Sequence, residues 1–234
     1  MIKIEKTEVM GWEAAIRGMR NPMNSWEMSD SEFKRYYILN DQLSEVCVPR
    51  LDIGTRDHKL MMGLRNAGTD HRKYLRMITV YCDITAPLYW WKEFDTYKVG
   101  TVANSCSTMH KIHAKEFTLD DFSHEELFNS DRGFRSDETV YDSGGTPWTS
   151  TDILELTIKY LNSMREEYLD TKDKRYWYQM IQLLPSSYNQ KRTVMLNYEV
   201  LANMYHSRKA HKLNEWHTFC NWVKTLPYSE LITG

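Results

Sequence analysis

The sequence predicts an α+β fold, in which a few strands pack with longer helices. The clearest strand lies at residues 78–85, where Ile78, Val80, Cys82 and Ile84 alternate with polar residues. We expect three or four strands and six or more helices, because most other apolar residues recur at helical spacing. No Gly-x-Gly-x-x-Gly, Walker or Cys-x-x-Cys motif occurs, so neither a Rossmann nor a P-loop protein is supported.

The N-terminal part of the chain predicts an edge strand followed by two helices. Residues 1–7 alternate like a strand, and residues 12–19 have the spacing of a short helix. After a polar loop, Ser29 or Ser31 can cap a second helix. The buried side of that helix would carry Phe33, Tyr36, Tyr37 and Leu43. Residues 49–54 contain Pro49 and Gly54 and are expected to break the chain again.

A third helix is expected over residues 56–76, with an interruption at Gly68. Leu60, Leu64 and Leu75 would face inward from it. The helix leads into the strand at residues 78–85. Pro87 then occupies the position of a first-turn helix proline, which predicts an aromatic-rich helix at residues 88–95.

The C-terminal half predicts long helices and one unusual loop. Residues 117–148 are acidic and lack periodicity, so they form either an insertion or a functional loop. Asp152 and Glu155 form a plausible capping box for a helix at residues 153–169. Residues 174–184 predict an amphipathic helix, and a last helix or helix pair is expected from about 188 to 224. We expect one domain over residues 1–234.

Bulk composition indicates an ordinary globular protein. The chain has 234 residues, a formal net charge of −2 and 41% hydrophobic residues, so no global charge favours nucleic acid or membrane binding. The scattered cysteines Cys47, Cys82, Cys106 and Cys220 are expected to be reduced thiols of a cytoplasmic protein. No apolar run has the length of a signal-peptide core or a membrane span.

Two separated stretches resemble those of one known family. The first begins with Ala86-Pro87-Leu88 and continues to Ser107. The second begins at Leu184-Pro185 and leads without a gap to Asn197 and Arg208. Residues 12–17 and 226–231 look like the first and last helices of the same family. Prolines, apolar spacing and polar anchors in this order resemble the flavin-dependent thymidylate synthases (ThyX).

The resemblance implies a fold, an activity and a set of partners. The fold would be a small antiparallel sheet packed with long helices, assembled as a homotetramer whose active sites draw on several chains. The activity would be methylation or alkylation of C5 of a pyrimidine deoxynucleotide such as dUMP. FAD would be the cofactor, with methylenetetrahydrofolate and NADPH as co-substrates. The reduced flavin would supply hydride, and the protein would position rings and charges.

The resemblance also implies site residues. Two of them, Ser107 and Lys98, would take part in catalysis; Ser107 matches a family serine that shapes the pyrimidine site. The substrate-binding positions would be Lys92, Glu93, Ser105, His110 and Arg208. The cofactor-binding positions would be His71, Thr96, Tyr97, Lys98, Asn104, Asn197 and Asn203. No metal is implied: the spacing His110-x-x-His113 can serve a metal, but no third ligand lies nearby.

Several of these positions also have purely structural explanations. Lys98 could contact a phosphate or lie in solvent, and Ser107 could cap a helix or turn. Asn104 and Ser105 could bond to a base edge or close a turn, and Asn197 and Asn203 could lie near flavin or bond to backbone within their helix.

The sequence departs from the family where phosphate would be held. The Arg and His that begin the family's Arg-His-Arg are Thr96 and Tyr97 here. The family's later phosphate-binding arginines fall on Met109 (or His110), Glu199 and Thr218. A family histidine near the flavin falls on Met77, and His71 could substitute for it. Losing three guanidinium contacts would cost roughly 1.5–3 kcal/mol each, and Glu199 would repel phosphate.

These departures leave three hypotheses open. The chain could be a divergent enzyme, a nucleotide- or flavin-binding relative without catalysis, or a protein-binding module built on its aromatic surface.

Overall fold

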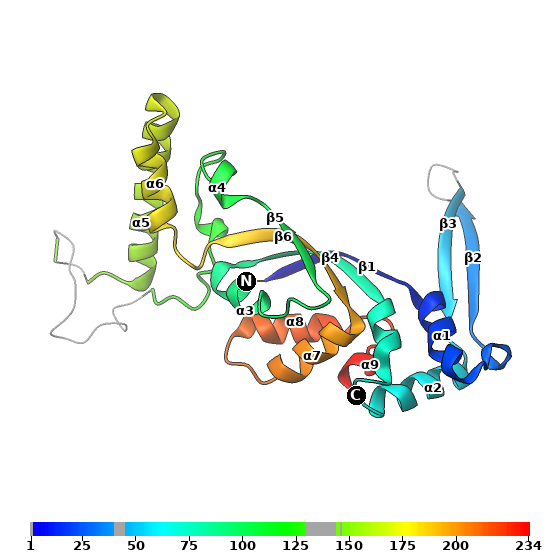
Figure 1. The fold of residues 1–234 in the computed structure, drawn as a ribbon. Coiled ribbons are helices and arrows are strands. Elements are labelled where there is room, and N and C mark those ends of the chain that lie inside the picture. The colour runs from blue at the N-terminus through cyan, green and yellow to red at the C-terminus, as the bar shows by residue number, and fades with distance from the viewer. Residues whose placement is uncertain (1, 40–44, 130–143, 146) are drawn as a thin grey trace. The chain divides into compact units, whose positions relative to one another are not determined.

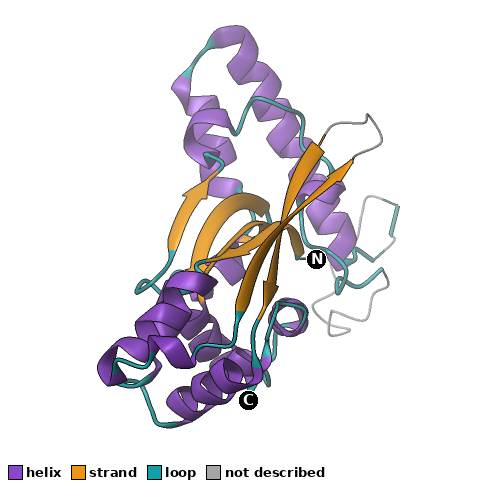
Figure 2. Ribbon diagram, turned by 90° about the vertical axis from the view of Figure 1, so that its right-hand side faces the viewer, coloured by secondary structure: helices purple, strands orange, loops and turns teal. Residues whose placement is uncertain are grey.

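A computed structural model describes the chain except residues 1, 40–44, 130–143 and 146 (Figure 1). The chain divides into two compact units. Unit 1 comprises Met1–Lys3, Ile84–Thr96 and Asn104–Thr193, and unit 2 comprises Ile4–Asp83, Tyr97–Ala103 and Val194–Gly234. The described residues form both helices and strands (Figure 2). Among the described helices, none combines the length and apolar character that crossing a bilayer requires.

The main sheet has four strands in the order β1-β4-β6-β5. They are β1 (Lys3–Met10), β4 (Thr79–Pro87), β5 (Val102–Ser105) and β6 (Asn189–Asn197). The edge strand β1 and the strand β4 confirm the predictions from alternation, since Val80, Cys82 and Ile84 are buried. The predicted fold class, α+β with a small antiparallel sheet, is confirmed.

The prediction of continuous helix from about residue 188 was wrong, because β6 occupies its first part. Gln190, Val194 and Leu196 are buried while Thr193 is exposed, which is the alternation of a strand. Pro87 also differs from its predicted place, since it ends β4 and precedes the first helical residue. Helix α3 (Leu88–Phe94) follows as expected.

A second sheet, a two-stranded antiparallel ribbon, belongs to unit 2. It consists of β2 (Glu32–Leu39) and β3 (Glu45–Asp52), with Glu32 opposite Asp52 and Leu39 opposite Glu45. The helix predicted here was therefore wrong, and Leu43 lies outside the described residues. Pro49 lies within β3 instead of breaking the chain, because a strand with only one neighbour tolerates a missing N–H.

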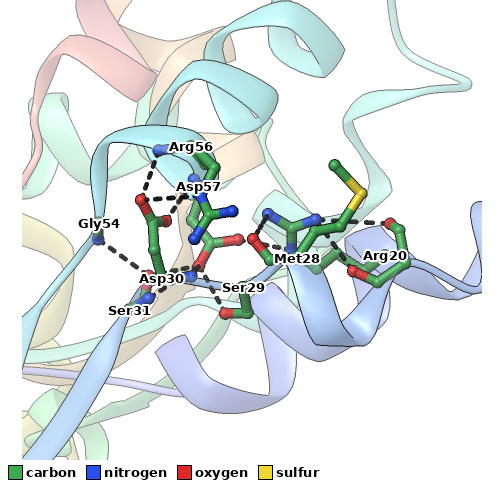
Figure 3. Close-up of polar contacts among 9 residues, drawn as sticks. Arg20, Met28, Ser29, Asp30, Ser31, Gly54, Arg56 and Asp57 are labelled. Atoms are coloured by element: carbon green, nitrogen blue, oxygen red, sulfur yellow. Dashed lines mark hydrogen bonds and ion pairs between the residues drawn. The ribbon is translucent and has the colours of Figure 1, made fainter.

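The predicted caps Ser29 and Ser31 serve a different purpose, which is to hold a buried carboxylate (Figure 3). Asp57 is completely buried and accepts hydrogen bonds from Ser29 Oγ (2.6 Å), Ser31 Oγ (2.7 Å) and Arg20 Nε (2.6 Å). Asp30 accepts bonds from the backbone N–H groups of Arg56 and Asp57 at the start of helix α2 (Thr55–Asn66). A Cβ at Gly54 would lie 2.2 Å from Asp30 Cγ, so this close approach requires glycine.

Unit 2 contains the N-terminal helices. Helix α1 (Trp12–Arg20) confirms the predicted short helix, and the single turns η1 (Asn21–Met23) and η2 (Trp26–Met28) follow it. The helix predicted over residues 56–76 is two elements, α2 (Thr55–Asn66) and η3 (Arg72–Met77). Gly68 separates them with a φ of +107°, a conformation that favours glycine, so the predicted interruption is confirmed.

The C-terminal helices α7 (Tyr198–Arg208), α8 (Asn214–Lys224) and α9 (Glu230–Thr233) also belong to unit 2. Tyr198, Leu201, Trp216, Phe219 and Leu231 are fully buried among them.

Unit 1 has its own apolar core beneath two long helices, α5 (Ser150–Thr171) and α6 (Lys174–Leu183). Phe117, Phe122, Leu161 and Met180 are central to it. The loop that contains η4 (Leu119–Asp121) thus supplies core residues, although much of the region 117–148 lies outside the described residues.

Helix α5 confirms the helix predicted at residues 153–169, but its capping box was assigned wrongly. The box is formed by Thr149 with Asp152: the Thr149 backbone N–H donates to Asp152 Oδ2 (2.7 Å), and the Asp152 backbone N–H donates to Thr149 Oγ1 (3.1 Å). Helix α6 confirms the prediction for residues 174–184.

Candidate functional site

A polar pocket of about 310 Å³ lies within unit 1. Its lining comes from β4, β6, the segment before the short helix α4 (Thr108–Lys111) and the loop around η4. Ser107, Lys115, Asp121, Tyr188 and Lys191 are part of this lining. The pocket therefore combines hydroxyl groups with charges of both signs, and it includes the predicted catalytic residue Ser107.

The segment that carries Ser107 is fastened to β6. The Cys106 N–H donates to Lys191 O (2.9 Å), and Gln190 Nε2 donates to Cys106 O (2.8 Å). Gln190 is buried, and its own carbonyl accepts a bond of 2.9 Å from Trp91 Nε1 of α3. Because these bonds pair both backbone groups of Cys106, the neighbouring Ser107 has a defined position at the pocket.

Ser107 also caps α4, which is the structural alternative predicted for it from the sequence. Its Oγ accepts a hydrogen bond of 3.0 Å from the His110 backbone N–H. A hydroxyl can accept this bond and still donate its proton elsewhere. Cap and ligand contact are thus compatible. The exposed imidazole of His110 does not line the pocket.

The charges of the pocket are partly paired. Lys115 forms an ion pair with Asp121, whose carboxylate also accepts bonds from Thr118. Burial raises the pKa of Tyr188, and the negative charge of Asp121 raises it further. The phenol therefore stays protonated at neutral pH and can donate a hydrogen bond. The lining thus holds two lysines and two carboxylates, Asp120 and Asp121, beside neutral hydroxyls, which suits a ligand with polar edges.

The other predicted residues of unit 1 lie outside this pocket. They are Lys92, Glu93, Thr96, Asn104 and Ser105. Lys92 is exposed on α3, and Thr96 closes that helix by donating from Oγ1 to Glu93 O (2.7 Å). Asn104 and Ser105 are exposed on β5.

A second group of predicted residues surrounds Arg208 in unit 2. Arg208 Nε donates to the Tyr97 hydroxyl (2.9 Å), and its guanidinium lies 4.8 Å from the centre of the Trp216 ring. A cation–π contact of this kind attracts the guanidinium to the ring by about 0.5–2 kcal/mol. Lys98, next to Tyr97, is exposed. The structure thus brings the predicted Tyr97 and Arg208 into direct contact.

Asn197 caps α7 and lies close to the loop that contains Tyr97 and Lys98. Its Oδ1 caps α7 by accepting from the Val200 N–H (2.9 Å). Gly100 has a φ of +82°, and a Cβ there would lie 2.5 Å from Asn197 Nδ2. Both the conformation and the close approach require glycine. The structural explanation of Asn197 accounts for these contacts.

Glu199, expected to repel phosphate, is buried and paired with two arginines of η3. Arg72 Nε lies 3.4 Å from Glu199 Oε1, and Arg76 binds both carboxylate oxygens. Arg72 also donates to the predicted cofactor residue Asn203 (3.1 Å). His71, immediately before η3, is exposed. The negative charge at Glu199 is therefore compensated, which corrects the expectation of repulsion.

Sequence reasoning missed Arg72, Arg76, Tyr188 and Lys191. The two arginines lie four apart before a strand, which puts them on one side of a helical turn. That spacing was visible, but nothing in it identified Glu199 as the partner. Within the described residues, no group of three or more His, Cys, Asp or Glu side chains could hold a metal ion.

No protein-family model and no curated protein sequence matches the chain. Solved structures do resemble it. A Helicobacter pylori flavin-dependent thymidylate synthase ThyX, complexed with FAD and dUMP, has a TM-score of 0.63 at 15% identity, covering 99% of this chain and 98% of its own. The Streptomyces cacaoi UMP/dUMP methylase PolB, bound with 5-Br dUMP, has a TM-score of 0.56 at 14% identity, covering 100% and 95%.

PolB bound with 5-Br UMP gives a TM-score of 0.58 at 12% identity, covering 100% of this chain and 94% of its own. At identities this low, the structural similarity establishes the fold alone. The residues that line a site must be judged from their own contacts. The near-complete coverage in both directions means that the architecture is shared from end to end. This chain has the fold of the flavin-dependent thymidylate synthases and is a divergent, ThyX-like example of it.

Proposed function

We propose that the protein is an FAD-dependent enzyme that methylates or alkylates C5 of a pyrimidine nucleotide such as dUMP. Methylenetetrahydrofolate would donate the carbon unit and NADPH would be the reductant. The observation that supports this most directly is the polar pocket around Ser107, in a fold whose solved examples include proteins with dUMP, 5-Br dUMP and 5-Br UMP.

The pocket offers what a pyrimidine nucleotide needs. A uracil ring presents carbonyl acceptors and an N–H donor, and Ser107, Tyr188 and Asn189 can satisfy both kinds of group. A phosphate requires cations, and Lys115 and Lys191 supply two. The ammonium of a lysine is a point charge without the planar fork of a guanidinium, so we expect weaker orientation of the phosphate than arginines would give.

The residues of unit 2 fit a flavin nucleotide. Asn203 supplies an amide, and Arg72 and Arg76 supply guanidinium donors beyond those bound to Glu199. When bound, the reduced flavin supplies the hydride of the reaction. The protein's own residues would orient the nucleotide, keep Tyr188 protonated as a donor and compensate negative charge.

A second candidate, a nucleotide- or flavin-binding relative without catalysis, is favoured by the contact between Tyr97 and Arg208. Where the resemblance places a histidine, the Tyr97 hydroxyl instead accepts from Arg208 Nε. That bond occupies one of the arginine's donors within the protein. Growth of a thymidine-requiring bacterial strain that expresses the chain would refute this candidate.

Spectroscopy of the purified full-length chain tests the proposal. We expect a flavin absorbance band that persists through gel filtration after incubation with FAD, and saturable binding of dUMP or UMP. Release of tritium from C5-labelled dUMP would then demonstrate chemistry at that carbon. A colourless protein that binds neither FAD nor any dUMP analogue would refute the proposal.

A matched pair of variants locates the nucleotide. Ser107→Ala removes a hydroxyl of the pocket, whereas Ser105→Ala removes one from the exposed strand β5 outside it. We expect weaker nucleotide binding only in Ser107→Ala. Equal affinities in both variants would move the nucleotide away from this pocket.

The assembly follows from the same proposal. We propose a homotetramer in the cytoplasm, and light scattering of the purified chain measures the mass directly. A monomer would contradict it.

A further inference from the structure

One side of α7 presents three polar residues, and each of them meets an arginine from another segment of unit 2. Positions 199, 203 and 206 are four and three residues apart, so they share one side of the helix. The pairs are Glu199 with Arg76, Asn203 with Arg72, and His206 with Arg65. Arginines thus line a face that contains a single carboxylate.

Arg72 and Arg76 share that carboxylate. Arg76 binds it through Nε and Nη2, and Arg72 binds it through Nε at 3.4 Å while its Nη2 reaches Asn203 at 3.1 Å. A guanidinium has five N–H donors. Among the residues that the structure describes, these bonds use only Nε and Nη2 of each arginine. The Nη1 groups of both therefore remain able to bind a ligand.

Arg65 has a different role, because the protein itself occupies its donors. Nε and Nη2 donate to the carbonyls of Leu231 and Ile232, at 3.2 and 3.4 Å, and Nη1 donates to Asn66 Oδ1 at 2.9 Å. Arg65 holds the C-terminal end of α9 and adds positive charge nearby.

The charge along this face is positive on balance. Burial lowers the pKa of His206, and the positive charges of Lys209 and Arg65 lower it further, so the imidazole is neutral at pH 7. Asp70 is a second carboxylate close enough to favour the charged form of Arg76. Three guanidinium groups, those of Arg65, Arg72 and Arg76, against the carboxylates of Glu199 and Asp70 leave a net positive charge, and Arg76, whose side chain is 53% exposed, presents it to solvent.

We propose that Arg72 and Arg76 form a phosphate-binding site that Glu199 holds in position. The resemblance places an arginine at position 199; here the cation comes from η3 instead, and the residue on α7 orients it. This inference rests on the proposed function, because the phosphate would belong to the nucleotide or to FAD. Guanidinium forks match phosphate oxygens better than the ammonium of a lysine does.

Arg76→Gln tests the site, with Lys73→Gln as the matched control. Lys73 is exposed in the same element and equals Arg76 in charge, so the pair separates a specific contact from general electrostatics. Binding of FAD, dUMP and inorganic pyrophosphate to the full-length chain is measured by calorimetry, and the thermal midpoint of each variant checks folding. Riboflavin and deoxyuridine, which lack phosphate, identify the source of the phosphate.

We expect Arg76→Gln to weaken the phosphate-bearing ligand about 10- to 100-fold, as the loss of charge-assisted hydrogen bonds predicts. Lys73→Gln should change it less than about twofold, a limit set by weak surface electrostatics. Riboflavin and deoxyuridine should bind equally to both variants. Loss of FAD affinity alone assigns the phosphate to the flavin, and loss of dUMP affinity alone assigns it to the substrate.

Equal losses in the two variants, or no loss in Arg76→Gln, would overturn the site. The outcomes also separate the site from the proposed function. If FAD and dUMP bind but Arg76→Gln has no effect, the site fails and the function stands. If only pyrophosphate binds, and Arg76 is needed for it, the function fails and the site stands. If the unaltered protein binds none of these ligands, both fail.

Discussion

Replacing Asp57 by asparagine should destabilise unit 2 more than any exposed substitution nearby. The Asp57 carboxylate is fully buried and accepts bonds from Arg20, Ser29, Ser31 and the Asp30 N–H (Figure 3). Asparagine keeps the shape but loses the charge, and its amide would point N–H donors at other donors. The buried guanidinium of Arg20 would also lose its counter-ion.

Breaking a buried ion pair by removing one partner costs about 3–5 kcal/mol. In a chain of this size that corresponds to a fall in thermal midpoint of about 6–20 °C. The assay is denaturant unfolding followed by circular dichroism, with thermal melts in parallel. Glu32→Gln is the control. Glu32 is an exposed residue of β2 in the same unit and pairs with the exposed Lys34, and such surface pairs contribute about 0–1 kcal/mol.

The pH dependence gives an independent check. Burial alone would raise the pKa of Asp57, but hydrogen bonds from Ser29, Ser31 and Arg20 together lower it below its ordinary value of 3.8. A lowered pKa contributes stability above the unfolded pKa, and this is lost as pH falls through the folded pKa. Asp57→Asn should therefore weaken the acid dependence below about pH 4. A loss under about 1 kcal/mol with an unchanged acid limb would refute the reasoning.

Three further predictions concern single contacts. Thr149→Ala removes the cap of α5 and should cost about 1 kcal/mol in urea unfolding, without changing nucleotide affinity; a larger effect on binding than on stability would contradict it. Tyr97→Phe leaves Arg208 without its hydroxyl acceptor and should cost about 1 kcal/mol, while Lys98→Gln, an exposed neighbour, should be within about 0.5 kcal/mol; equal costs would argue against the bond. Tyr188 should ionise only above its ordinary pKa of 10, as ultraviolet difference absorbance during an alkaline titration can measure, and a normal titration would contradict its burial.

Local sequence patterns identified the elements whose stability comes from their own amphipathic spacing. The strand β4 and the helices α1, α3, α5 and α6 were all predicted close to their observed bounds. Each has either strict alternation or a helical stripe that faces one core. The spacing of prolines and polar anchors also identified the fold class through resemblance, which the similarity to solved ThyX structures confirms.

The tertiary structure alone decided the elements that depend on distant partners. A helix was predicted at the ribbon β2–β3 because Ser29 and Ser31, just before β2, resemble helix caps. In the structure, both serines instead donate hydrogen bonds to Asp57 of α2. A helix was predicted at β6 because the sequence does not show which of its side chains are buried. Their alternation between buried and exposed depends on the neighbouring strands β4 and β5.

The candidate sites divide in the same way. Ser107 was predicted from its motif, since a motif is local, and it lines the polar pocket of unit 1. The pairing of Glu199 with Arg72 and Arg76 was not found, because those residues lie more than a hundred positions apart in sequence. Local spacing determines which faces a segment can bury, but whether a buried charge repels a phosphate or positions a cation depends on the partners that folding brings to it.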